Sequence, residues 1–188
     1  MTTDLSVPLR AITDLLDRAA IPYMVVGSFA AMAHGVPRTT HDLDIVIDPS
    51  ATSLDHFLRE LDPESFYVDA DVARDAFRRR SMFNVIDMNT AWKVDLIVRK
   101  DRPFSIEELR RRTVARLADT DVATATAEDT IIAKLEWARA SNSERQLADV
   151  AGILRVHAAT LDLEYIERWV DHLGLLVPWA AARSLTSS

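Results

Sequence analysis

Three aspartates interrupt two apolar runs of the sequence that are typical of β-strands. Asp42 and Asp44 flank Leu43 in the first run, and Asp95 lies in the second, residues 92–98. Because side chains alternate between the two faces of a strand, the first two carboxylates share one face. Aspartate is depleted from strands, and such conflicts with local propensity tend to mark functional positions. Three carboxylates predict a site for a hard divalent cation such as Mg²⁺, which shares its shell with substrate phosphates.

Gly27 and Ser28 precede these aspartates and lie where a short predicted strand, residues 23–26, gives way to a helix. Glycine lets a ligand approach the backbone, a helix N-terminus offers unpaired N–H groups, and the serine hydroxyl adds a donor. The alternative is that Ser28 only caps its helix. Together with the carboxylates, whose mutual repulsion a cation offsets, the pair favours a phosphate cradle and nucleotide chemistry.

Lys134 lies among apolar residues of a predicted helix, where an ammonium needs an anionic partner. A triphosphate is one such partner. Pairing with Glu128 or Glu136, or extension of the side chain to solvent, is the alternative. Arg145 and Asp149 have i, i+4 spacing, so a structural salt bridge is the first interpretation and a role in positioning substrate the second.

The loop before the aspartates adds further candidates. The planar guanidinium of Arg38 predicts a phosphate clamp, whereas His41 is expected to be solvated, because transfer assisted by two metal ions needs no imidazole base. We expect His34 to pack against or cap the end of its helix. Asp48 shares the strand face of Asp44 but follows about 13 Å further along, so we expect it to cap the strand end.

The composition fits a folded protein of ordinary domain size. With 188 residues and 48% hydrophobic content, the chain can form a core. It has no cysteine, which excludes a disulfide framework, a thiolate nucleophile and a cysteine-based zinc site. No apolar stretch reaches the roughly 18 residues of a spanning helix, and the N-terminus lacks the pattern of a signal peptide. We therefore expect a soluble, cytoplasmic protein without a membrane partner.

The net charge of −7 hides one basic segment. Residues 74–116 hold twelve Arg and Lys against six Asp and Glu, and the arginines are densest at 78–80 and 110–112. A polyanion such as RNA could bind there if both runs face one side of the fold. The alternative interpretation is that the two runs are solvated helix ends.

The order of periodic patterns predicts a mixed first part and a helical last part. Strands are predicted at 23–26, 42–48, 82–88, 92–98 and 121–125. Helices are predicted at 8–20, 28–34, 51–61 and 71–79, from 105 onwards, and at 127–140, 144–158, 162–173 and 175–184. We interpret the chain as a core, residues 1–125, followed by a helical region, residues 126–188, that packs on it.

These motifs together resemble those of a known superfamily. The string Val25-Val26-Gly27-Ser28, followed by Asp42-Leu43-Asp44-Ile45, matches the hG[GS] and DhDh signature of nucleotidyltransferases with the DNA-polymerase-β-like fold. Val94-Asp95-Leu96 is similar to the strand that carries the third carboxylate of that superfamily. Within it, residues 31–44 and 128–149 resemble the bacterial AbiEii/AbiGii-type toxin nucleotidyltransferases.

The resemblance implies an α+β fold, in which a nucleotidyltransferase-type mixed β-sheet with flanking helices is followed by a C-terminal helical bundle. It also implies that the carboxylates hold two Mg²⁺ ions and that an NTP is the substrate. It assigns Asp42, Asp44 and Asp95 as metal ligands and catalytic residues. The residues argued above complete the candidate site, with Gly27, Ser28, Arg38 and Lys134 as nucleotide-binding residues and Arg145 and Asp149 as possible substrate-positioning residues.

The leading functional hypothesis is transfer of a nucleoside monophosphate from an NTP to a hydroxyl, with release of pyrophosphate. The resemblance suggests an RNA acceptor, such as the 3′ end of a tRNA, or a protein acceptor, and a toxin that works beside an antitoxin protein. One alternative is a small-molecule (antibiotic) nucleotidyltransferase. A second is a non-catalytic nucleotide-binding or antitoxin-like module. A third, a metal-dependent phosphohydrolase, leaves Gly27 and Ser28 unexplained.

Overall fold

The structure, a computed structural model, describes residues 6–37, 40 and 42–186. Its strands are β1 (Tyr23–Val25), β2 (Asp42–Ile47), β3 (Phe66–Tyr67), β4 (Met82–Asp87), β5 (Lys93–Val98), β6 (Thr113–Leu117) and β7 (Thr120–Thr124). In this part of the chain they form one seven-stranded sheet in the order β3-β4-β5-β2-β1-β7-β6. The pairs β2–β5 and β1–β7 are parallel and the others antiparallel, so the sheet is mixed.

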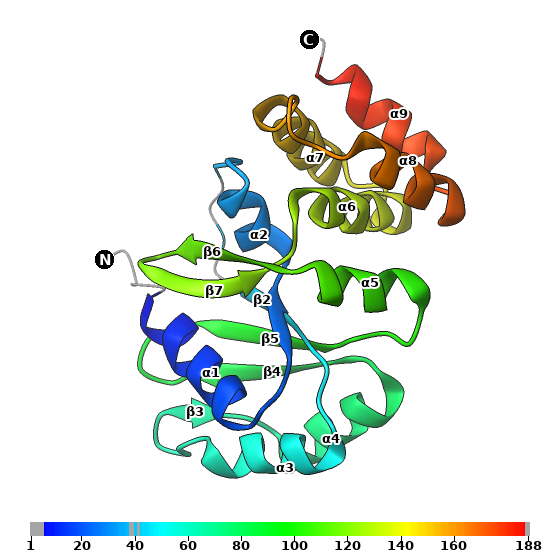
Figure 1. The fold of residues 1–188 in the computed structure, drawn as a ribbon. Helices are drawn as coiled ribbons and strands as arrows, with labels where there is room; N and C mark the ends of the chain where they lie inside the picture. Colours follow the sequence, from blue (N-terminus) through cyan, green and yellow to red (C-terminus); the bar gives the residue numbers. More distant parts are fainter. Residues whose placement is uncertain (1–5, 38–39, 41, 187–188) are drawn as a thin grey trace.

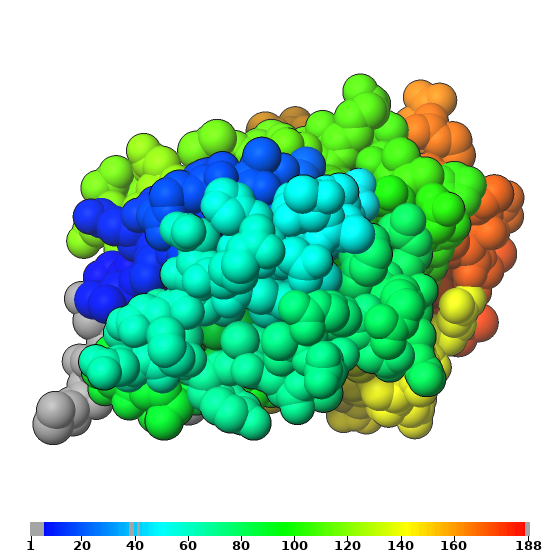
Figure 2. Space-filling view, turned by 90° about the horizontal axis from the view of Figure 1, so that it is seen from below, coloured from blue at the N-terminus to red at the C-terminus, as the bar shows by residue number. Residues whose placement is uncertain are grey.

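Helices cover both faces of the sheet (Figure 1). On one face lie α1 (Ser6–Arg18), α3 (Ala51–Glu60) and α4 (Ala70–Arg79), which form a continuous surface in the view from below (Figure 2). On the other lie α2 (Gly27–Ala33) and α5 (Pro103–Arg111). The last four helices, α6 (Ala127–Ser141), α7 (Glu144–Val156), α8 (Leu163–His172) and α9 (Leu176–Ser184), pack together beyond one end of the sheet. No helix among the described residues combines the length and apolar character that a membrane span requires.

The predicted α+β architecture with C-terminal helices is confirmed, but two strands were missed. β3 has only two residues. β6 is an edge strand that buries little of its surface, so its sequence lacks a clear apolar alternation. Its hairpin to β7 turns through Ala118 and Asp119, both with positive φ. Because Asn-Gly or Asp-Gly usually marks such a turn, the sequence carried no hairpin signal there.

The alternation of β2 decides where its carboxylates point. Leu43, Ile45 and Ile47 are completely buried in the largest hydrophobic cluster, against α1 and α3. Since neighbouring side chains of a strand point to opposite faces, Asp42 and Asp44 lie on the face of the sheet that carries α2 and α5. Burial of the apolar side chains of β2 therefore determines the face of the sheet on which its aspartates lie.

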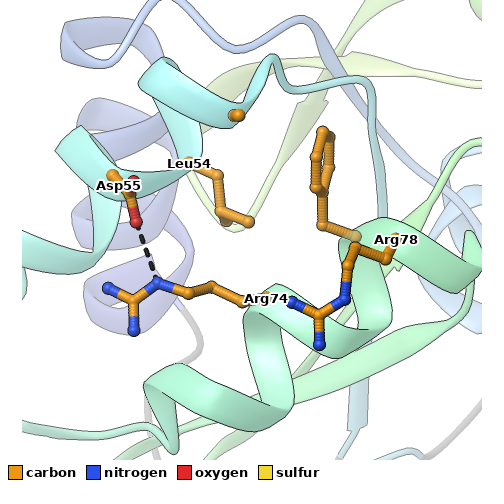
Figure 3. A pocket seen from close by; sticks show the side chains of 6 residues that line it. Leu54, Asp55, Arg74 and Arg78 are labelled. Carbon is orange, nitrogen blue, oxygen red and sulfur yellow. Dashed lines mark hydrogen bonds and ion pairs between the residues drawn. The ribbon is translucent and has the colours of Figure 1, made fainter.

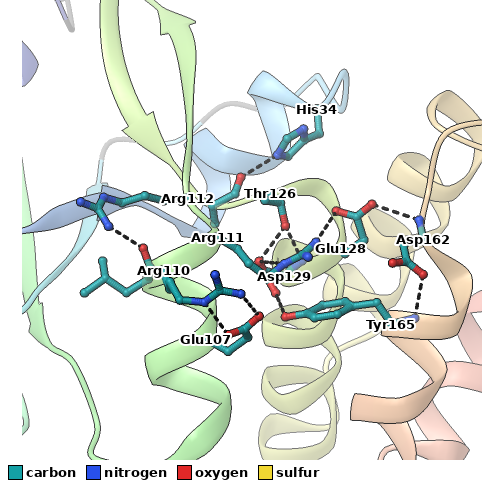
Figure 4. Close-up of polar contacts among 12 residues, drawn as sticks. His34, Glu107, Arg110, Arg111, Arg112, Thr126, Glu128, Asp129, Asp162 and Tyr165 are labelled. Carbon is teal, nitrogen blue, oxygen red and sulfur yellow. Dashed lines mark hydrogen bonds and ion pairs between the residues drawn. The ribbon is translucent and has the colours of Figure 1, made fainter.

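A buried polar cluster fastens the last helices to the sheet domain (Figure 4). The fully buried carboxylate of Asp129, at the start of α6, accepts hydrogen bonds from Tyr165 of α8 at 2.6 Å and from Thr126 at 2.7 Å. Arg111 at the end of α5 contributes a third, at 3.3 Å. The predicted division at residues 1–125 and 126–188 falls between β7 and α6, beside this cluster, and stays a prediction.

Glu108 on α5 lies near the same cluster and predicts a pH-dependent stability. Burial and the nearby Asp129 raise its pKa to about 8, from the ordinary 4.5, while Arg102 opposes the shift. A raised pKa means that the folded chain holds a proton that the unfolded chain releases, so stability falls as the pH rises from about 4.5 to about 8. We expect Glu108→Gln to raise the unfolding free energy at pH 8 by roughly 2 kcal/mol or more and to change it little at pH 5.

Urea unfolding of both proteins at the two pH values measures this difference. Glu107→Gln is the control, because Glu107 is adjacent, partly exposed and paired with Arg110 at 2.7 Å, which lowers its pKa. That variant should lose rather than gain stability at pH 8. Equal effects of the two substitutions would show that the burial of Glu108 does not govern its titration.

Candidate functional site

The register of β2 against β5 brings the predicted carboxylates together. Asp44 pairs with Asp95, and Asp42 pairs with Lys93, across these parallel strands. All four positions have the same parity, so their side chains share the face that carries α2. The sequence predicted the three acids as one cluster, and this arrangement brings them together in space.

Asp44 lies at the centre of this cluster. Burial is the main cause that raises its pKa to about 6, and the negative charges of Asp95 and Asp42 raise it further. The positive charges of Lys93 and Lys134 act in the opposite direction. A crowded, half-buried carboxylate of this kind favours any additional cation beside it.

Gly27 forms the wall of the site next to Asp44. Its φ is +64°, and a Cβ added to it would lie 2.2 Å from Oδ2 of Asp44. The adjacent backbone N–H of Val26 donates to the carbonyl oxygen of Asp44 at 2.9 Å. Only glycine tolerates both this left-handed conformation and so close an approach. The group that comes this close to Gly27 is the Asp44 carboxylate, and the predicted approach of a ligand to this backbone stays a prediction.

Ser28 is buried in the first turn of α2. The helix begins at Gly27 and its N-cap is Val26, without a side-chain cap hydrogen bond. Ser28 is therefore not the cap that the alternative interpretation required. Because α2 has only seven residues, the candidate phosphate-binding groups are Gly27 and the Ser28 hydroxyl rather than a helix dipole.

Two residues beside Asp95 were not singled out from the sequence. Asn84, its partner on β4, donates a hydrogen bond from Nδ2 to Oδ1 of Asp95. The ammonium of Lys93 lies 3.1 Å from Oδ2 of Asp95 and 3.5 Å from Oδ1 of Asp42. Both carboxylate oxygens of Asp95 therefore have a donor. The spacing of Lys93, two residues before Asp95 on one strand, was the signal that could have indicated it.

Lys134 has a partner that the sequence did not indicate. The side chain is buried, and its ammonium lies 2.7 Å from Oδ2 of Asp149 and donates to Gln146 at 3.1 Å. The expected alternatives, the glutamates on its own helix, are not these partners. The expected salt bridge between Arg145 and Asp149 is also replaced, since Asp149 pairs with Lys134 and Arg145 is exposed. The positive charge of Lys134 also acts to lower the pKa of Asp44.

The remaining candidates have simpler positions. Arg38 and His41 lie outside the described residues, so the predicted phosphate clamp stays a prediction. His34 donates from Nε2 to the carbonyl oxygen of Ala125 at 2.8 Å, and burial lowers its pKa. It packs between α2 and the chain that leads into α6, as expected of a structural histidine. Asp48 forms an ion pair with Arg99 at 2.9 Å.

The carboxylates fit a divalent cation as a partial ligand set. Over the ranges 6–37, 40 and 42–186, no three histidine, aspartate or glutamate side chains are arranged to hold a metal ion by themselves. Mg²⁺ usually takes only one or two protein carboxylates and completes its shell with water and substrate phosphates. Asp44 and Asp95, adjacent in register, match that requirement. The three-carboxylate set predicted with Asp42 stays a prediction.

Several arginines of the two runs form ion pairs within the chain. Arg78 and Arg79 pair with Asp75 at 3.1 and 2.8 Å. In the second run, Arg110 pairs with Glu107 at 2.7 Å, and Arg111 reaches Asp129. These contacts favour the interpretation of both runs as helix ends, because paired guanidinium groups are less able to attract a polyanion.

A pocket lies between α3 and α4, away from the carboxylates. Leu54, Asp55, Arg74 and Arg78 line it, and the ion pair of Arg74 with Asp55, 3.0 Å long, closes one end (Figure 3). None of the residues that line it is a predicted site residue. We therefore assign the candidate site to the carboxylate face and not to this pocket.

The overall architecture is shared with solved nucleotidyltransferase structures. Two structures of the antibiotic-resistance factor ANT(2'')-Ia, one in complex with adenylyl-2''-tobramycin, match with TM-scores of 0.57 and 0.55 at 14% identity, and the first match covers 98% of this chain and 97% of that one. An antigenic nucleotidyltransferase-like protein from Paracoccidioides brasiliensis matches with a TM-score of 0.53 at 16% identity over 97% of this chain and 93% of that one. The chain has the nucleotidyltransferase fold.

The lincosamide antibiotic adenylyltransferase LnuA matches with a TM-score of 0.51 at 12% identity, over 79% of this chain and 95% of that one. No protein-family model and no curated protein matches the sequence. At such low identities the similarity extends to the fold alone.

Proposed function

We propose that this chain is a Mg²⁺-dependent nucleotidyltransferase, which moves a nucleoside monophosphate from an NTP to an acceptor hydroxyl and releases pyrophosphate. The observation that carries this proposal is the juxtaposition of Asp44 and Asp95 on adjacent parallel strands, with the Gly27 backbone packed against Asp44. Carboxylates can bind the metal ion of a metal–triphosphate complex, and a glycine backbone beside them lets the phosphates come close. The similarity of the fold to nucleotidyltransferases supports the same reaction.

Each side chain has a part that follows from its position. Asp44 and Asp95, with Asp42 beside them, would hold Mg²⁺, which when bound neutralises the triphosphate and activates the acceptor hydroxyl. Asn84 holds the carboxylate of Asp95 in one orientation. Ser28 offers a hydroxyl to a phosphate oxygen, and the buried Lys134 adds positive charge near Asp44. The protein thus contributes positioning and electrostatics, which is what phosphoryl chemistry requires.

For the acceptor we propose first an RNA hydroxyl, such as a tRNA 3′ end, or a protein hydroxyl, modified by a toxin that an antitoxin partner restrains. The support is the resemblance of residues 31–44 and 128–149 to the AbiEii/AbiGii-type toxins. The ion pair of Lys134 with Asp149 links two of the residues that carry this resemblance.

A small-molecule acceptor is the second candidate, and two observations favour it. The structural neighbours include ANT(2'')-Ia and LnuA, whose names identify antibiotic resistance and lincosamide adenylylation. The arginine runs that could have bound RNA are also paired within the chain. An acceptor of the size of an aminoglycoside needs no basic surface.

The test uses purified protein, Mg²⁺ and α-³²P-labelled NTPs, with total cellular RNA, total cellular protein and a panel of aminoglycosides and lincosamides as separate acceptors. We expect label in one acceptor class and release of pyrophosphate. Label sensitive to RNase, to protease, or to neither distinguishes the three classes. Release of phosphate in place of pyrophosphate would favour the phosphohydrolase, and NTP binding without turnover on any acceptor would favour the non-catalytic module.

A further inference from the structure

Lys93 contacts two of the three carboxylates of the candidate site. Its ammonium lies within 3.1 Å of Asp95 and 3.5 Å of Asp42, one residue on each of the two strands. Asp44 is the register partner of Asp95, so the four side chains form a square of three acids and one cation. The ammonium is thus paired with two of the carboxylates that the proposed function assigns to the cation.

The choice of lysine at this place is unusual for this chain. The sequence contains nineteen arginines but only three lysines, Lys93, Lys100 and Lys134, and the charges of two of them act on Asp44. Most other ion pairs among the described residues are made by arginine, as for Arg99 with Asp48 and Arg102 with Glu136, with the buried pair of Lys134 and Asp149 as an exception. A guanidinium binds carboxylates bidentately and holds them, whereas an ammonium is a compact, well-hydrated point charge on a flexible stem.

The surroundings of Lys93 allow the ammonium to leave. Its side chain is 40% exposed, while that of Asp95 is only 10% exposed. Asn84 continues to hold Oδ1 of Asp95, so departure of the ammonium frees Oδ2 without releasing the carboxylate. A divalent ion bound to Oδ2 and a monovalent ammonium beside it repel each other and compete for one oxygen.

We propose that Lys93 is an exchangeable internal counter-ion, which pairs with Asp42 and Asp95 in the metal-free protein and gives way to the divalent cation. This inference rests on the proposed function, since it concerns the same metal site. In this role Lys93 is a positioning residue that lowers the affinity of the free protein for metal, so that the cation binds mainly together with its nucleotide.

The experiment titrates the purified full chain with Mn²⁺ and follows free Mn²⁺ by electron paramagnetic resonance. We expect Lys93→Met to bind Mn²⁺ about tenfold more tightly than the wild type, because no cation competes for Asp95. We expect Lys93→Arg to bind it more weakly, because the guanidinium grips the carboxylates. Lys100→Met, which alters an exposed lysine beyond the other end of β5, should leave the affinity unchanged.

A second measurement covers the case in which Lys93→Met is poorly folded. In EDTA this variant should melt at a lower temperature than Lys100→Met, and Mn²⁺ should restore it, whereas Lys93→Arg should melt like the wild type. Equal or weaker Mn²⁺ affinity in Lys93→Met overturns the role of Lys93 and leaves the proposed function intact. If neither protein binds Mn²⁺, even with an α,β-methylene ATP analogue, the proposed function itself fails.

Discussion

Asp44→Asn is expected to lower the rate of nucleotidyl transfer by roughly three orders of magnitude. This corresponds to a loss of several kcal/mol in the metal-dependent stabilisation of the transition state. Asparagine keeps the shape of the side chain but removes the charge that would hold the cation. The same substitution should make the protein more stable at pH 8 in EDTA, by about 1–3 kcal/mol. Activity and stability are therefore expected to change in opposite directions.

The sign of the stability change follows from the pKa. Burial and the neighbouring carboxylates raise the pKa of Asp44 from 3.8 to about 6. A carboxyl group with a raised pKa in the folded state favours folding while it is protonated, below its pKa in the unfolded chain. This contribution is lost as the pH rises through the pKa of the folded state, so at pH 8 the fully charged Asp44 destabilises the fold. Thermal melting at pH 5 and pH 8 measures this, and the gain of Asp44→Asn at pH 5 should be about half of that at pH 8.

Asp48→Asn is the matched control, because Asp48 follows β2 and has the same parity as Asp44. Its carboxylate pairs with Arg99 instead of other acids. That variant should keep its transfer activity and lose up to about 1 kcal/mol of stability. A loss of stability in Asp44→Asn, or full activity of that variant, would contradict the assignment of Asp44 to the metal site.

Gly27→Ala is expected to reduce activity by about a hundredfold or more. The new methyl group would meet Oδ2 of Asp44 at 2.2 Å, so the carboxylate must move from its place beside Asp95. The left-handed backbone conformation adds a cost of about 1–2 kcal/mol in stability. Steady-state kinetics and urea unfolding of the same preparation measure the two effects.

Gly174→Ala separates the effect of the contact with Asp44 from the effect of the left-handed backbone conformation. Gly174 has nearly the same φ, +67°, but an added Cβ would meet only the Arg139 guanidinium, at 3.5 Å. This control should lose a similar amount of stability from its backbone and retain its activity. If both variants were equally active, close contact of Gly27 with Asp44 would not matter to catalysis.

Local physics made several of these features predictable from the sequence. The period of two along a strand determined that Asp42 and Asp44 share a face, and Leu43 and Ile45 determined which face is buried. The change from strand to helix at Gly27 was likewise visible, as were the C-terminal helices. Each of these depends on residues that are close together in the chain.

Contacts between distant segments decided the rest. Pairing of β2 with β5 brings Asp44 to Asp95 across fifty residues, and it places the Lys93 ammonium among the acids. Lys134 was recognised from the sequence as a buried cation, but its partner Asp149 depends on how α6 packs against α7. Strand register and helix packing are set by the whole core, since a one-residue shift would turn every buried side chain outward. The amino-acid sequence by itself thus determined which side chains were available for chemistry, and the tertiary structure decided which of them meet.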